Sequence, residues 1–148
     1  EALVKLRQVI CDPKAFVGEA VHPTENAISA VLKIVNYLPS KVNVAELLRF
    51  TLPLMPLRND SVEGRASHEL LCNFIEKYPD VMLGEGMVNG PKIVAVFAEV
   101  VDTKFLSNAS IPRVASIVRT ITSRLPADAF AGIPAAHAAR LQQFMSKH

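Results

Sequence analysis

The sequence has only two cysteines, and it has no apolar run of the roughly 20 residues that a membrane-spanning helix needs. Two cysteines do not build the disulfide framework of a small secreted domain, so the composition indicates a reducing compartment. An excess of one charge is also missing, because 16 lysines and arginines accompany 14 acidic residues and the net charge is +2. The chain therefore lacks the strongly basic character of a nucleic-acid-binding protein.

What the sequence does contain is enough apolar material for a folded domain. Half of its 148 residues are hydrophobic and a fifth are charged, which is too apolar for a disordered chain and sufficient for a sizeable core. It carries no initiator methionine and no signal-peptide pattern, and it opens inside a helical pattern at Glu1. We expect residues 1–148 to be a fragment of a longer protein.

The clearest helical pattern runs from Asp60 to Tyr78. Apolar side chains recur there every three or four residues, which predicts an amphipathic helix. Asp60 and Glu63 have the spacing of a capping box, and Pro79 ends the helix. The predicted inward face carries Ala66, Leu70, Phe74 and Tyr78, with Ser67, Leu71 and Ile75 beside them. The predicted outward face carries Arg65, Glu69, Cys72 and Glu76.

Similar patterns predict further helices along the chain. Thr24, Asn43 and Ser110 are good N-cap residues at three of the predicted starts. Pro53 and Pro56 are expected to kink or fray the helix that contains them. Residues 79–90 hold three glycines and are predicted to form a loop. The further helices are predicted over residues 1–10, 24–38, 44–57, 91–105, 111–125 and 135–147.

The order of these elements predicts an all-α fold of about seven helices. The first helices of three successive pairs begin near residues 1, 44 and 91, in steps of 43 and 47 residues. This is the period of two-helix repeats of the HEAT and armadillo kind. We therefore expect a HEAT-repeat α-solenoid with pairs at 1–38, 44–78 and 91–125, and a terminal capping helix at 135–147.

Two motifs suggest bound ligands but lack the necessary spacing. Cys11, His22, His68 and Cys72 do not form the two tight pairs that zinc sites use, so we expect no metal. The glycine-rich stretch 84–92 is not a phosphate-binding loop, because Lys92 is not followed by serine or threonine. We expect this stretch to be a flexible connection between repeats.

Charged side chains on the helices indicate a binding protein and not an enzyme. Glu69 and Glu76 lie two helical turns apart on a solvated face, so a general acid or base role is not expected. Arg113, Arg119 and Arg124 spread over the outward face of one helix; they form either a solvated surface or a patch that meets an acidic partner. Since no desolvated cluster of ionisable groups is apparent, we expect neither catalysis nor a cofactor.

The sequence resembles the C-terminal end of the karyopherin-beta family of nuclear import receptors, in the importin beta-3 branch. The most specific part of the resemblance is the run Thr24–Ala30, TENAISA, with scattered identities through most of the chain. They include Glu1–Leu3, Lys33–Ile34, Val42–Val44, Leu52–Leu57, Leu71–Cys72, Ile75–Glu76, Val81–Gly84, Pro91–Ile93, Val118–Arg119 and Leu141–Gln142.

The resemblance implies a right-handed stack of HEAT repeats in which the second helix of each repeat lines a concave, cargo-binding surface. Members of the family carry protein cargo from the cytoplasm into the nucleus through weak contacts with Phe-Gly repeats of the nuclear pore. They release cargo when the GTP-bound small GTPase Ran binds, mainly to N-terminal repeats. On this pattern the inner helices are 24–38, 60–78 and 110–125.

We therefore predict that this chain binds protein cargo with the outward side chains of those three helices. The alternative is a HEAT-repeat scaffold of another class, such as a phosphatase or assembly scaffold, whose same face holds a partner subunit. Helical geometry selects the candidates for these contacts: Glu25, Ser29, Lys33, Asn36, Arg65, Glu69, Glu76, Arg113, Thr120 and Arg124.

Overall fold

The computed structural model describes residues 1–148 and contains helices, turns and loops but no β-strand. The predicted all-α class is confirmed. None of the helices is both long enough and apolar enough to cross a membrane. The eight α-helices are α1 (Ala2–Ile10), α2 (Val21–Tyr37), α3 (Val44–Thr51), α4 (Ser61–Lys77), α5 (Pro79–Leu83), α6 (Gly90–Val100), α7 (Ile111–Arg124) and α8 (Ala135–Lys147).

The helix α5 lies in the segment that was predicted to be a loop. Pro79 ends α4, but its fixed φ and missing amide hydrogen also suit the first position of a new helix. After α5, Gly84 and Gly86 adopt positive φ values of 73° and 62°, which glycine reaches without strain. The chain then re-enters a helix, α6, which ends at Val100 because Val101 is extended. The predicted end near Phe105 is therefore wrong.

The start of α2 also differs from the prediction. The helix begins at Val21, directly after a 3₁₀ turn at Gly18–Ala20, so Thr24 is not its N-cap. Thr24 instead lies inside the first turns with its hydroxyl 2.6 Å from the Ala15 carbonyl oxygen. Pro23 does not interrupt the helix, because the amide hydrogens of the first turn have no partner within the helix.

The predicted N-cap of α4 is confirmed, but the capping box is only half formed. The Asp60 carboxylate accepts hydrogen bonds from the amides of Val62 and Glu63, both at 3.0 Å. The Glu63 side chain does not return to Asp60; its carboxylate accepts bonds from Ser29 and Lys33 of α2. A contact between two helices has replaced the local one. Asn43 caps α3 in the same way as Asp60, through the amide of Glu46 at 3.1 Å.

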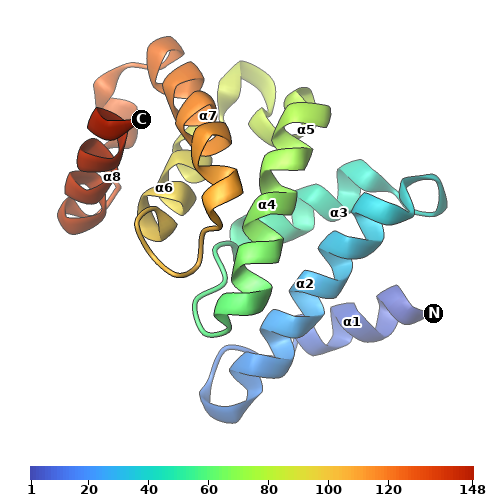
Figure 1. Cartoon of the computed structure of the whole chain (residues 1–148). Helices are drawn as coiled ribbons and strands as arrows, with labels where there is room; N and C mark the ends of the chain where they lie inside the picture. Colours follow the sequence, from blue (N-terminus) through green and yellow to red (C-terminus); the bar gives the residue numbers. More distant parts are fainter.

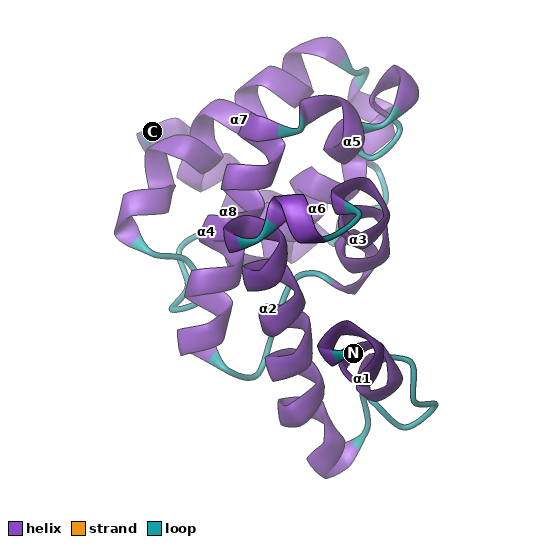
Figure 2. Cartoon of the chain, turned by 90° about the vertical axis from the view of Figure 1, so that its right-hand side faces the viewer, coloured by secondary structure: helices purple, strands orange, loops and turns teal.

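The helices form two layers. In Figure 1, α2, α4 and α7 lie side by side, and we call them the front layer. Behind them are α1, α3 and α6, the rear layer, and α1 packs against α2 while α6 packs against α7. Figure 2 shows α1 and α3 on one side of α2 and α4. The last helix, α8, packs against α6.

The middle helix of the front layer is more deeply buried than its amphipathic pattern predicts. Thirty-two buried residues form one core cluster, and Phe74 of α4 is among the largest of them. Cys72, which was assigned to the outward face, is 0% exposed, and so is His68. Because α4 contacts α2 and α7 at its sides, only a narrow strip containing Glu69 and Glu76 faces solvent.

Candidate functional site

A row of polar side chains crosses the front layer from α2 to α7. It consists of Asn36, Asn73, Glu76 and Arg113, and we call it the polar row. The Arg113 guanidinium donates to both Glu76 carboxylate oxygens, at 2.8 and 2.9 Å, and to the Asn73 side-chain oxygen at 2.6 Å. The Asn73 amide nitrogen in turn lies 3.5 Å from the Asn36 side-chain oxygen. Three helices that are far apart in sequence thus present one continuous line of polar groups.

A small hollow of about 190 Å³ lies beside the polar row, between α2 and α4. Tyr37, which is 73% exposed, stands at this hollow together with Leu70. Lys33 and Glu69 add one charge of each sign to its lining. An exposed aromatic ring next to hydrogen-bonding groups is typical of surfaces that bind polypeptides.

The charges of the polar row are held in fixed positions. Bonding to Arg113 lowers the pKa of Glu76, and bonding to Glu76 raises the pKa of Arg113. The pair is partly open to water, since 49% of the Glu76 side chain and 28% of the Arg113 side chain are exposed. Exposed ion pairs stabilise a fold by no more than about 1 kcal/mol, so substitutions here test binding without unfolding the chain.

Two of the predicted contact residues on α2, Ser29 and Glu25, are buried and not available to a partner. Ser29 is 1% exposed and donates to Glu63, which also accepts a bond from Lys33 at 2.9 Å. The Ser29 bond, followed by the Lys33 bond, lowers the pKa of Glu63. Lys33 remains half-buried at the edge of the hollow beside the polar row. The prediction that Ser29 faces outward is wrong, because α2 turns this residue toward α4.

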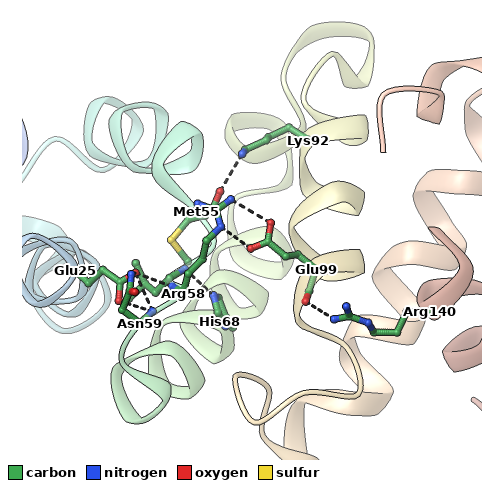
Figure 3. Close-up of polar contacts among 9 residues, drawn as sticks. Glu25, Met55, Arg58, Asn59, His68, Lys92, Glu99 and Arg140 are labelled. Carbon is green, nitrogen blue, oxygen red and sulfur yellow. Dashed lines mark hydrogen bonds and ion pairs between the residues drawn. The ribbon is translucent and has the colours of Figure 1, made fainter. Parts of the chain in front are cut away.

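Glu25 is the clearest correction among the predicted site residues. Its side chain is 4% exposed, and it binds the segment Met55–Asp60, which we call the connector (Figure 3). The Glu25 carboxylate accepts bonds from the amides of Arg58, Asn59 and Asp60 at 2.6, 3.0 and 3.1 Å. The carboxylate therefore accepts hydrogen bonds from amides just before α4 and is not accessible to a partner.

The remaining predicted residues are distributed along the front layer. Arg65 donates to the Lys104 carbonyl oxygen at 2.8 Å, and Thr120 donates to the Ser116 carbonyl oxygen at 3.0 Å. Arg124 is exposed at the end of α7. The structure thus gathers Lys33, Asn36, Glu69, Glu76 and Arg113 and leaves Thr120 and Arg124 further along α7. Two residues of the site were missed, Tyr37 and Asn73. Helical spacing could have found Asn73, four residues after Glu69 and three before Glu76.

The connector fixes the layers relative to one another. Arg58 donates to both carboxylate oxygens of Glu99 on α6, at 2.5 and 3.1 Å. Lys92 of α6 donates to the Met55 carbonyl oxygen at 2.9 Å, and burial lowers the pKa of this lysine. Arg140 of α8 donates to the carbonyl oxygen of Glu99 at 2.7 Å. Figure 3 shows this network running from α2 through the connector to α6 and α8.

His68 joins the connector to the segment after α6. The Leu57 amide donates to Nε2 of His68 at 3.2 Å, so Nδ1 carries the ring proton and donates to the Phe105 carbonyl oxygen at 2.7 Å. A second proton on Nε2 would point at the Leu57 amide hydrogen. Burial lowers the pKa of His68, although the Phe105 bond and the charges of Glu25 and Glu99 oppose the shift. His68 is therefore a neutral, structural histidine.

We expect acid to destabilise the chain through His68. Since its folded pKa lies below the ordinary value of 6.5, its contribution is complete above pH 6.5 and is lost as the pH falls toward the folded pKa. The free energy of unfolding should fall there by up to about 1.4 kcal/mol per pH unit. Urea titrations between pH 5 and pH 7.5 measure this slope.

The control for this effect is His68→Gln, which offers a donor and an acceptor but does not titrate. Below pH 6.5, the free energy of unfolding of this variant should change less with pH than that of the parent. Glu63 and Glu76, whose pKa values are lowered from 4.5, act in a separate window, because their contributions are lost only as the pH falls below 4.5. If the free energy of unfolding depends equally on pH for parent and variant above pH 5, His68 is not the group responsible for the acid sensitivity.

The cysteines and histidines do not assemble a metal centre. No group of three or more histidine, cysteine, aspartate or glutamate side chains lies close enough together to hold a metal ion. Burial raises the pKa of the Cys72 thiol to about 12, so it does not supply a thiolate at neutral pH. Cys11 is exposed at the end of α1.

No protein-family model matches the sequence. The polar row supplies amide donors and acceptors, a paired charge and a neighbouring aromatic ring. Groups of these kinds can hydrogen-bond to the backbone and side chains of a polypeptide segment. The candidate site is therefore a surface on the front layer with the hydrogen-bonding groups that polypeptide-binding surfaces use.

Proposed function

We propose that this chain is a set of HEAT repeats from the C-terminal part of a nuclear import receptor, which binds protein cargo for Ran-dependent transport through the nuclear pore. The sequence resemblance to the karyopherin-beta family supports this proposal. A second support is the arrangement of two layers, in which α2, α4 and α7 form a shared polar face.

The observation that carries the repeat interpretation is the spacing of the contacts between helices. Side-chain hydrogen bonds recur between residues 37 to 41 positions apart, along both layers. Arg7 with Glu46 and Arg58 with Glu99 are examples in the rear layer, and Asn36 with Asn73 is one in the front layer. Stacked two-helix units of about 40 residues produce this regularity, because each unit contacts only its neighbours.

In this proposal the polar row holds an extended segment of cargo. The side-chain amides of Asn36 and Asn73 have the donor and acceptor pair that matches a peptide group. Glu69 and Glu76 attract basic residues of the cargo, and Arg113 accommodates an acidic one, as expected for a basic or mixed-charge signal. Tyr37 and the hollow beside it take up an apolar side chain.

The rear layer offers a separate surface for pore proteins. A hollow of about 370 Å³ lies between α3 and α5, with Leu52, Pro53, Met82 and Val88 in its lining. Val88 is 70% exposed. We propose that this hollow receives the phenylalanine of a Phe-Gly repeat, while Ran is held mainly by repeats elsewhere in the full-length receptor.

The transport proposal is tested on the full-length receptor from which this chain comes. The receptor is mixed with an immobilised basic nuclear cargo, and Ran loaded with GTP is then added. We expect cargo to bind and to be displaced by Ran. If cargo stays bound and the receptor takes up no Ran, the chain belongs instead to a HEAT scaffold of another class, such as a phosphatase or assembly scaffold.

The same assay locates the cargo surface. We expect the double substitution Glu69→Ala and Glu76→Ala to weaken cargo binding about tenfold, equivalent to about 1.4 kcal/mol. The matched control is Glu19→Ala with Glu85→Ala, which also removes two exposed carboxylates but leaves the polar row intact. Equal cargo affinities for the two double variants would show that Glu69 and Glu76 do not contact the cargo.

A further inference from the structure

A groove lies near the C-terminal end of the chain, between α7 and α8. Both helices pack on α6, and the groove between them has a volume of about 610 Å³. This volume lies within the range of about 300–1,000 Å³ that is typical of ligand sites. Its lining is mainly apolar and includes Val94 of α6, Val118 of α7, and Leu141 and Met145 of α8.

The shape of the groove fits a helix. The lining residues on α8 recur along one face of most of the helix: Ala135, Ala138, Ala139, Gln142 and Met145. The lining residues of α8 run from Ala135 to Met145, a length of about 15 Å or about three helical turns. The alanines have small side chains, and they allow the backbone of a third helix to approach closely. α7 and α8 run in the same direction (Figure 1), so they form two similar walls.

The charge around the groove selects the kind of helix. Arg119 is the one charged side chain in the lining of the groove, and no acidic side chain lines it. Arg119 lines the groove and is exposed, with its guanidinium 3.1 Å from the main-chain oxygen of His148. Arg124 and Lys147 are exposed at the ends of the two walls. A second copy of the same basic surface would be repelled, whereas an acidic partner would be attracted.

We propose that the α7–α8 groove binds one amphipathic α-helix of a partner protein, with its apolar stripe in the groove and acidic residues along both flanks. Leucine-sized side chains at helical spacing fill the space above Val94 and Leu141. Glutamates on the flanks face Arg119 in the lining, with Arg124 and Lys147 exposed at the C-terminal ends of α7 and α8. This inference does not depend on the transport proposal, because it uses a different surface and a different chemistry.

The probe is a fluorescein-labelled peptide of 16 residues with leucines at one helical stripe, glutamates on both flanks and alanines elsewhere. We expect fluorescence anisotropy with the 148-residue chain to give a dissociation constant on the order of 10 μM, and the affinity should fall as salt is added. A peptide of the same composition with the stripe scrambled should not bind. A peptide with lysines in place of the glutamates should bind at least tenfold more weakly.

Substitutions on α8 locate the binding surface. Ala138→Glu places a bulky negative side chain in the groove and should weaken binding at least tenfold. Ala136→Glu is the matched control, because Ala136 is exposed on the same helix but does not line the groove, and it should leave binding unchanged. Arg119→Glu should also weaken binding about tenfold, whereas Lys41→Glu, on the far side of the array, should not. Thermal unfolding by circular dichroism verifies that each variant is folded.

Four results of these experiments would show that the groove does not bind an acidic amphipathic helix. The proposal is overturned if the striped peptide does not bind, if Ala138→Glu and Ala136→Glu bind it equally, or if the lysine peptide binds as tightly as the glutamate peptide. Equal binding of the scrambled peptide would mean that the surface recognises acidic charge and not a helix, which also overturns the proposal. Failure of the cargo and Ran assay has no bearing on any of these results.

Discussion

Replacing Glu25 with alanine is expected to lower the free energy of unfolding by about 3 kcal/mol, because three amides of the connector lose their acceptor. The carboxylate binds the amides of Arg58, Asn59 and Asp60 at 2.6 to 3.1 Å. These amides lie just before α4, where no carbonyl oxygen of the helix is available to replace the Glu25 carboxylate as acceptor. Hydrogen bonds to a charged acceptor are also stronger than neutral ones.

Urea denaturation followed by circular dichroism measures this loss. Glu19→Ala is the control, since Glu19 is an exposed carboxylate just before α2 and its removal should change stability by less than about 0.5 kcal/mol. Glu25→Gln should give an intermediate loss, because it retains one acceptor oxygen but places an amide group toward the connector. If Glu25→Ala is no more destabilising than Glu19→Ala, the connector amides do not rely on this carboxylate.

The Glu25 result also affects how cargo binding is interpreted. Because Glu25 is 4% exposed, a loss of cargo affinity in Glu25→Ala would arise from displacement of α4 and not from a missing contact. Variants of Glu76 do not have this problem, since its side chain is 49% exposed. Stability and binding should therefore separate, with Glu25 controlling the first and Glu76 the second.

Replacing His68 with leucine is expected to cost about 3 kcal/mol. The change leaves the buried Leu57 amide and the partly buried Phe105 carbonyl oxygen without their side-chain partner. An unsatisfied buried donor or acceptor costs about 1–3 kcal/mol, and two are created at once. Gly64 packs close to the same place, where an added Cβ would lie 2.7 Å from the Phe105 ring, so the structure has little room to relax.

The measurement is again the free energy of unfolding, at pH 7.5 so that protonation of His68 does not contribute. His22→Ala is the control, because His22 is exposed in the first turn of α2. His68→Gln should recover part of the loss, since its amide can replace both hydrogen bonds. A His68→Leu variant as stable as the parent would show that packing alone holds the connector against α4.

The sequence was sufficient for the positions of most helices. Local interactions explain this success. The periodic apolar residues of α4, the Asp60 cap and the helix-ending Pro79 act within a few residues of one another, and each is visible in the sequence. The short helix α5 was missed because Pro79 was taken only as a stop and not also as a first residue.

The candidate site was only partly predictable. Helical spacing placed Glu69 and Glu76 on the open strip of α4, and it placed Asn36 on the same layer. The spacing does not reveal that Arg113 reaches Glu76 across 37 positions, or that Asn73 completes the row. The polar row depends on the packing of α4 between its neighbours, which is a property of the assembled layer.

What the sequence determined by itself is the set of helices, because caps, prolines and apolar periodicity act locally. Only the tertiary structure decided which polar residues are buried. Glu25 and His68 look like surface residues in a helical pattern, but their partners are backbone groups 33 to 35 and 11 to 37 positions away. A helix in the middle of an array is covered on several sides, so a polar residue opposite its apolar stripe is buried whenever a neighbouring segment supplies its hydrogen bonds.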